Sequence, residues 1–125
     1  MTENLGVLAS TESMDAVALC EFALKLEQLG YESFWLPELF GREPVATAAY
    51  LLGQTTQLKI ATGIANVYVR DAYAMAQTRQ TLAELSAGRF ILGLGVSNPG
   101  LNQTRGHVWQ MPLPKMKSYL AAMVE

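Results

Sequence analysis

The sequence predicts an α/β fold built on a parallel sheet. Four short apolar segments alternate with amphipathic segments of helical period. They recur about every 29 residues, close to the ~31 residues of one unit in an eight-unit (β/α)8 barrel. Each segment is apolar on consecutive residues, which indicates a strand covered on both faces. A barrel and a doubly wound sheet both fit this pattern, and periodicity alone does not choose between them.

The first two units are expected in residues 5–52. Leu5–Ala9 predicts the first strand, and Ser13 is expected to cap the helix that follows. That helix is expected to end at Gly30, directly before a second strand at Ser33–Pro37. Pro44 suits the first position of the next helix. The apolar stripe of the first helix comprises Leu19, Phe22, Ala23, Leu26 and Leu29.

The next two units are expected in residues 58–125. Leu58–Val67 is rich in β-forming residues and predicts the third strand. Asp71 is expected to cap a helix that ends at Gly88, before a fourth strand at Arg89–Val96. After an irregular stretch a last helix is expected from about residue 114. The apolar stripes of these two helices comprise Met75, Leu82 and Leu85, and then Met116, Leu120, Met123 and Val124.

Composition excludes several classes of function. Only 16% of residues are charged and the formal net charge is -2, so no basic surface for nucleic acid is expected. No apolar run approaches the ~18 residues of a membrane span, and the first residues lack a signal-peptide pattern. One cysteine, Cys20, favours a reducing compartment, so we expect a cytoplasmic protein. With one Cys and one His, no metal site is expected.

Two glycines near the end of the fourth predicted strand raise the question of a nucleotide-binding turn. The dinucleotide fingerprint G-x-G-x-x-G follows the first strand, whereas Gly93 and Gly95 belong to the fourth and Asn98 occupies the third glycine position. A glycine inside an apolar strand instead lets another group approach the backbone closely. That group is either a packed side chain or a flat ligand ring, and the segment alone fits both.

Three phrases of the sequence resemble the bacterial luciferase-like family. They are GYESFWLPE, GREPVATAAYLLGQT and LKIATGIANVYVRDAYAMAQTRQTLAELSAGRFILGLGVS. The similarity is greatest to the branch of oxidoreductases that use the deazaflavin coenzyme F420, and it is densest from Leu29 to Val96. The resemblance implies a (β/α)8 TIM barrel of which residues 1–125 form the first four βα units. These would be the N-terminal half of one domain, truncated at its C-terminus.

The resemblance also implies a site at the carboxyl ends of the strands, where TIM barrels carry their active sites. Family members have a non-proline cis peptide behind the coenzyme ring, and the matching bond is Gly63–Ile64. Asn102 matches the position where one branch of the family has a polar contact to the coenzyme, if a one-residue gap is allowed in the match. Leu39 and His107 are the expected substrate-pocket residues, with a surface histidine as the alternative. The implied coenzyme-binding residues are Gly63, Ile64, Ala65, Asn66, Gly93, Gly95, Val96, Ser97, Asn98 and Asn102.

The sequence departs from the branch of the family that oxidises a sugar phosphate. That branch has Asp-His after the second strand and Glu after the fourth, where this chain has Glu38-Leu39 and Asn98. An asparagine is not a general acid or base. Glu38 is therefore the expected catalytic residue, for proton transfer or for a hydrogen bond to the coenzyme ring. The alternative is a solvated loop carboxylate.

The expected function is F420-dependent hydride transfer with a small organic substrate. An FMN-dependent monooxygenase of the same fold is the alternative enzyme, and a truncated half-barrel that only self-associates is the alternative without catalysis. Because four parallel strands leave two open edges, we expect a homo-oligomer or pairing with a C-terminal half. The candidates for the uncovered inner face are Leu8, Trp35, Ile60 and Leu92.

Overall fold

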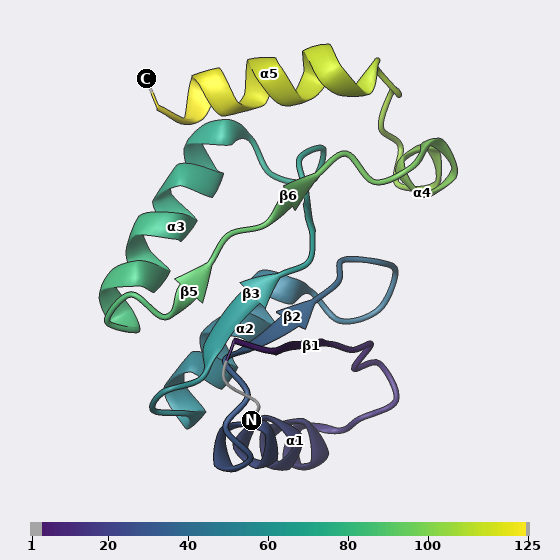
Figure 1. The fold of residues 1–125 in the computed structure, drawn as a ribbon. Coiled ribbons are helices and arrows are strands. Elements are labelled where there is room, and N and C mark those ends of the chain that lie inside the picture. Colours follow the sequence, from purple (N-terminus) through teal and green to yellow (C-terminus); the bar gives the residue numbers. More distant parts are fainter. Residues whose placement is uncertain (1–3, 125) are drawn as a thin grey trace.

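The structure, a computed structural model, describes residues 4–124 and is organised around parallel strands. Four of them form one sheet in chain order, and two shorter strands pair with each other beyond it (Figure 1). All pairings are parallel. The main sheet contains β1 (Gly6–Leu8), β2 (Ser33–Leu36), β3 (Lys59–Thr62) and β5 (Phe90–Ile91), and the second pair is β4 (Ala65–Asn66) with β6 (Leu94–Gly95).

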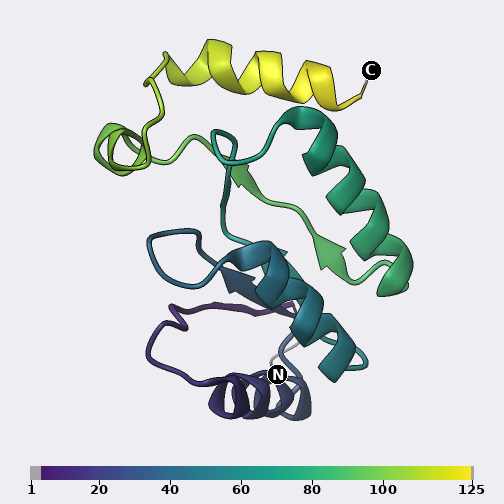
Figure 2. The same ribbon diagram turned by 180° about the vertical axis from the view of Figure 1, so that it is seen from behind.

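Helices connect the strands and cover one face of the sheet. Figure 2 shows α2 in front of the strands, with α3 to the right of them and α1 below. A sheet in chain order with its helices on one face is the arrangement of a barrel, whereas a doubly wound sheet reverses its order and carries helices on both faces. The barrel alternative is therefore confirmed. The helices are α1 (Ala16–Gln28), α2 (Pro44–Gln54), α3 (Ala72–Leu85), α4 (Pro99–Thr104) and α5 (Pro112–Met123).

The main core lies between the sheet and its helices. Phe34, Ile60 and Phe90 are register partners on β2, β3 and β5, and all three are buried. They form one cluster with residues of α1, α2 and α3. Ile60 is 0% exposed and belongs to this helix-facing row, so its expected place on the inner face is wrong. Alternation along the strands puts the neighbouring row on the opposite face.

The opposite face of the sheet is open. Its row runs through Leu8, Trp35, Ala61 and Ile91, which are register partners. Leu8 is 66% exposed and Trp35 is half-buried, as expected for the inner face of an incomplete barrel. Leu92 is half-buried and packs against both hydrophobic clusters. Large apolar side chains on this face therefore lack an opposing layer within the described chain.

Two of the expected strands are each divided in two. Leu58–Val67 is interrupted at Gly63–Ile64, where the peptide bond is cis, as the family resemblance predicts. Arg89–Val96 is interrupted beside Gly93, where the Thr62 hydroxyl replaces part of the ladder. This hydroxyl donates to the Gly93 carbonyl at 2.8 Å and accepts from the Gly93 N–H at 2.9 Å. A Cβ on Gly93 would overlap the Thr62 carbonyl oxygen, so this glycine is required by a packed backbone.

Local capping explains most of the helix boundaries. The side chain of Asp15 caps α1 by accepting from the Ala18 N–H at 2.8 Å, so the expected Ser13 cap is wrong. Asp71 caps α3 as expected, accepting from the Ala74 N–H at 2.8 Å. Gly30 adopts a φ of 84° just beyond α1 and donates its N–H to a carbonyl of the last turn. This left-handed conformation suits glycine and confirms the expected stop.

The last part of the chain differs most from expectation. The stretch after β6 was expected to be irregular but contains α4, capped by the Asn98 side chain on the Leu101 N–H at 2.9 Å. On α5 the packed residues are Met116, Tyr119 and Met123, while Leu120 and Val124 are exposed. Leu85 of α3 is likewise 74% exposed rather than buried. No helix within residues 4–124 is long and apolar enough to cross a membrane.

Alanine at Gly93 is expected to destabilise the chain, because its Cβ would meet backbone that cannot rotate away. Overpacking of this kind costs about 1–3 kcal/mol. Gly53, in α2, has no atom within 4 Å of the corresponding Cβ position. Gly53→Ala is therefore the matched control and should stabilise by about 0.5–1 kcal/mol through helix propensity. Urea unfolding of both variants is the measurement, and equal midpoints would contradict the close approach at Gly93.

Candidate active site

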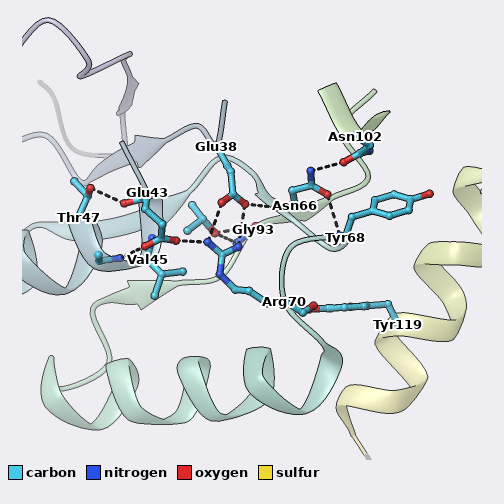
Figure 3. Close-up of polar contacts among 12 residues, drawn as sticks. Glu38, Glu43, Val45, Thr47, Asn66, Tyr68, Arg70, Gly93, Asn102 and Tyr119 are labelled. Atoms are coloured by element: carbon cyan, nitrogen blue, oxygen red, sulfur yellow. Dashed lines mark hydrogen bonds and ion pairs between the residues drawn. The ribbon is translucent and has the colours of Figure 1, made fainter. Parts of the chain in front are cut away.

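The carboxyl ends of the strands bring the sequence-predicted site residues to one edge of the molecule. Glu38 follows β2, Asn66 ends β4, and Val96–Asn98 follows β6. Parallel strands in chain order place these loops next to each other, although they are about 30 residues apart in sequence. Figure 3 shows Glu38, Asn66 and Asn102 side by side at this edge. Leu39 lies in the loop after Glu38 and is 47% exposed.

A buried ion pair occupies the centre of this edge. Arg70 Nη1 donates to Glu38 Oε1 and Arg70 Nη2 to Glu38 Oε2, each at 2.9 Å. The Asn66 N–H also donates to Glu38 Oε1, at 2.7 Å. The Glu38 side chain is 3% exposed and that of Arg70 is 13% exposed. Both oxygens of the expected catalytic carboxylate are therefore held by other groups of the chain.

A second carboxylate extends the ion pair to the start of α2. Arg70 Nη2 also contacts Glu43 Oε1. Glu43 is the N-cap of α2, and its oxygens accept from the Val45 N–H at 3.1 Å and the Ala46 N–H at 2.6 Å. One guanidinium thus joins the loop after β2, the start of α2 and the turn before α3 (Figure 3).

The charges in this group shift one another's protonation equilibria. Burial disfavours the charged form of Arg70, but its hydrogen bonds and attraction to Glu38 and Glu43 outweigh burial and raise its pKa. Burial acts to raise the pKa of Glu43, yet the Ala46 and Val45 N–H groups and Arg70 together lower it. The guanidinium and the Glu43 carboxylate are therefore both charged at neutral pH.

Two buried amides continue the network toward β6. Asn66 Nδ2 donates to Asn102 Oδ1 at 2.7 Å, and Asn102 Nδ2 donates to the Val96 carbonyl at 2.8 Å. Asn66 Oδ1 accepts from the Tyr68 N–H at 2.9 Å. Both asparagines are 0% exposed. The amide of Asn102, expected to contact a coenzyme, is thus buried and hydrogen-bonded at both ends to protein partners.

The Ile64 side chain packs against Gly95. A Cβ on Gly95 would lie 2.6 Å from Cδ1 of Ile64, so the Ile64 side chain packs over this glycine. Gly63 itself lies under Trp35, with 3.3 Å between its Cβ position and the tryptophan Cβ. The packed-side-chain alternative therefore holds for Gly95 in this structure, whereas the group closest to Gly93 is the Thr62 backbone carbonyl. Their coenzyme-facing role stays a prediction.

His107 belongs to an aromatic group around Tyr68. It is half-buried in the loop between α4 and α5, with its ring 5.8 Å from the ring of Tyr68. Trp109 stacks on the same tyrosine at 5.8 Å, and Lys115 Nζ lies 4.7 Å from its ring centroid. Tyr68 was not singled out from the sequence, since nothing in its spacing marks it as the centre of an aromatic group.

A cleft opens beside the ion pair. It has a volume of about 270 Å³ and is lined by Arg105 and by the loop from Glu38 to Glu43. Arg42 is fixed there, because its guanidinium donates to the carbonyls of Thr11 and Met14 at 2.7 Å each. Leu39 and Phe40 give the cleft exposed apolar sides. A small molecule with apolar and polar parts fits this lining.

Comparison with known proteins identifies the relatives of the chain. The profile of one family, described as luciferase-like monooxygenase, matches residues 2–125. The chain is 32% identical over 106 residues to 5,10-methylenetetrahydromethanopterin reductase of Methanolobus tindarius, covering 84% of this chain and 32% of that protein. It is 29% identical over 101 residues to a putative coenzyme F420-dependent oxidoreductase of Mycobacterium tuberculosis, covering 80% and 29%. The chain therefore spans about a third of the length of these curated relatives.

Solved structures share the fold. A coenzyme F420 dependent tetrahydromethanopterin reductase of Methanopyrus kandleri superposes with a TM-score of 0.82 at 17% identity, covering 94% of this chain and 38% of that one. The oxygenating constituent of 3,6-diketocamphane monooxygenase of Pseudomonas putida, solved in complex with FMN, gives 0.82 at 17%, covering 98% and 39%. At these identities the likeness concerns the fold alone. The four βα units are therefore part of a TIM barrel.

Replacing Arg70 is expected to leave the buried Glu38 carboxylate without its cation. Arg70→Gln should lower the free energy of unfolding by about 3–5 kcal/mol, the usual effect of breaking a buried pair from one side. Arg79→Gln, at an exposed position of α3, is the control and should stay within about 0.5 kcal/mol. Adding Glu38→Gln to Arg70→Gln should recover part of the loss. Chemical denaturation measures all of them, and equal stabilities of the two single variants would contradict a desolvated pair.

Tyr119 is expected to make the chain sensitive to alkali. Its hydroxyl donates to the Arg70 carbonyl at 2.7 Å, and burial is the main cause that raises its pKa to about 12. The pKa of an unfolded tyrosine is about 10, so this contribution to stability is complete below about pH 10 and is lost as pH rises through about 12. Tyr119→Phe should be less stable at neutral pH but lose less stability over that interval. Unfolding midpoints measured at stepped pH test this, and parallel curves would refute it.

Proposed function

The chain belongs to the luciferase-like monooxygenase family, and we propose that it forms the coenzyme-binding edge of an F420-dependent oxidoreductase acting on a small organic substrate. One curated relative described above is named as a reductase and the other as a putative coenzyme F420-dependent oxidoreductase. Because the chain spans about a third of their length, the activity belongs to an assembly larger than these four βα units. Within that assembly the coenzyme performs the redox step, and the protein binds and orients it.

The observation that carries the proposal is the convergence of the strand ends. Ile64 and Gly95 pack together at the carboxyl ends of β3 and β6, and Val96–Asn98 continues from the same edge. A flat ring placed there would lie against apolar side chain and bare backbone. The adjacent cleft between Arg105 and the loop from Glu38 to Glu43 would then receive the substrate. We propose the coenzyme-binding residues implied by the resemblance as the residues that face the ring, except Asn102.

F420 is favoured over FMN by the sequence relatives. The relative with 32% identity is a methylenetetrahydromethanopterin reductase, and the one with 29% is named for F420. The neighbour in complex with FMN has 17% identity, a level at which only the fold is comparable. A direct titration decides between the two coenzymes.

Glu38 is proposed to hold the backbone at Asn66 rather than to transfer protons in the arrangement described. Its Oε1 accepts the Asn66 N–H and its two oxygens face Arg70. A carboxylate in this environment accepts a proton from substrate only after the guanidinium withdraws from one oxygen. Proton transfer by Glu38 therefore requires a movement of Arg70.

We further propose that the barrel is completed by additional βα units, either from a second copy or from a C-terminal half. Residues 1–125 would then be the N-terminal half of one barrel domain. The four-stranded sheet ends at β1 on one side and at β5 on the other, with no further partner strand in the described residues, and its inner face leaves Leu8 66% exposed. Closing a barrel removes such edges and buries the inner side chains.

Coenzyme titration is the main test of function. We expect F420 to bind the purified protein more tightly than FMN, measured as quenching of ligand fluorescence. Gly95→Leu places a larger side chain against Ile64 at the proposed ring position and should abolish binding. Gly53→Leu, an equal change in open space on α2, should leave binding intact. Tighter binding of FMN would overturn the choice of coenzyme, and equal affinity of the two glycine variants would overturn the site.

Self-association of the 125-residue chain is expected because of its open edge and inner face. Burying a large apolar side chain is worth about 1.5–3 kcal/mol, so covering even Leu8 and Trp35 favours association. Sedimentation at micromolar concentration should show dimers or larger species. A monodisperse 13.7 kDa species with a cooperative unfolding transition would contradict this account.

A further inference from the structure

We infer that Asn102 is a positioning residue that fixes the turn after β6 for the coenzyme, and not a residue that touches it. The inference rests on the proposed function and replaces the direct contact that the resemblance implied. It is carried by the two buried amides of Asn66 and Asn102, by the carbonyl they hold, and by the backbone conformation of the next residue.

Both polar atoms of the Asn102 side chain have partners inside the protein, and burial keeps them from a ligand. Its Oδ1 accepts from Asn66 Nδ2 at 2.7 Å and its Nδ2 donates to the Val96 carbonyl at 2.8 Å. The residue is 0% exposed. An amide whose two ends are paired in a buried site acts on a coenzyme only through its partners. Those partners are the end of β4 and the residue directly after β6.

The carbonyl that Asn102 holds belongs to the residue before a left-handed turn. Ser97 has a φ of 60°, a conformation that is unfavourable for a residue with a Cβ and persists only where the surroundings enforce it. Asn102 secures Val96 on one side of Ser97. On the other side the Asn98 side chain accepts from the Leu101 N–H at 2.9 Å and starts α4, the helix that carries Asn102. The turn is thus held at both ends by the first turn of α4.

The Asn66 and Asn102 side chains also connect this turn to the ion pair of Glu38 and Arg70. Glu38 accepts the backbone N–H of Asn66 at 2.7 Å, and the Asn66 side chain bonds Asn102 (Figure 3). The loops after β2, β4 and β6 are therefore joined by one continuous set of hydrogen bonds. Because β4 and β6 are only two residues long, their ladder is too short to fix these loops alone. The buried amides supply the missing constraint.

The test begins with Asn102→Leu, which keeps the approximate volume and removes both hydrogen bonds. We expect the dissociation constant of F420, or of FMN if the titration favours it, to rise about tenfold or more, as small misplacements of a binding group commonly do. Deuterium exchange of backbone amides in residues 94–98 should accelerate relative to residues 33–36 without any coenzyme present. Gln103→Leu, the exposed neighbour on α4, should change neither quantity.

Two further variants separate positioning from stability. Leu26→Ala opens the main core far from the turn and should lower stability while leaving coenzyme affinity and relative exchange at wild-type values. Ser97→Gly adopts a φ of 60° without steric cost, so adding it to Asn102→Leu should restore part of the affinity. A residue that only fills the core would not be rescued in this way.

The outcomes are decisive for each claim. Folded Asn102→Leu protein with unchanged affinity and exchange would overturn the inference, and so would an equal loss of affinity in Leu26→Ala. Absence of rescue by Ser97→Gly would remove the link to the turn. If the unmodified protein binds neither coenzyme, the proposed function fails. The exchange measurement, which needs no coenzyme, then still decides whether Asn102 holds the turn.

Discussion

The arrangement of the candidate site depends on the buried pairing of Glu38 with Arg70. A carboxylate with 3% exposure is tolerated only when a cation and hydrogen bonds replace its lost water. The cation comes from the turn before α3, and a further hydrogen bond comes from the backbone of Asn66. Since one guanidinium also holds Glu43 at the start of α2, both ends of the β2–α2 loop and the turn before α3 are set relative to one charge. The positions of these segments therefore depend on one another through Arg70.

The sheet makes that pairing possible. Strands in chain order bring the ends of β2 and β4 to the same edge, although Glu38 and Arg70 are 32 residues apart. The helix-facing row through Phe34, Ile60 and Phe90 anchors the strands on one side. Their other side holds Leu8 and Trp35 in the open. Packing on the helix-facing side holds the strands and the loops at their ends. The inner face stays uncovered because a barrel has eight βα units and the described chain has four.

Sequence patterns predicted what depends on local periodicity. The four units, the caps at Asp71 and Gly30 and the helix at Pro44 follow from spacing and from the chemistry of single residues. The strand break beside Gly93 did not follow, because it arises from the Thr62 hydroxyl 31 residues away. Burial on α5 was also misjudged, since Leu120 lies off the face that contacts α3. An apolar stripe at helical spacing does not show which of its residues contact a neighbouring helix.

The candidate site could be predicted as a set of residues but not in its connections. The resemblance indicated Glu38, Asn66 and Asn102, which the structure brings together, but a motif does not show whether a polar atom already has a partner. Here the polar atoms of Glu38 and Asn102 form hydrogen bonds with Arg70, Asn66 and Val96. In the proposed site, a coenzyme ring would therefore meet the Ile64 side chain and the backbone after β6. A site made of backbone and one aliphatic side chain needs rigid support, and the buried polar network supplies it.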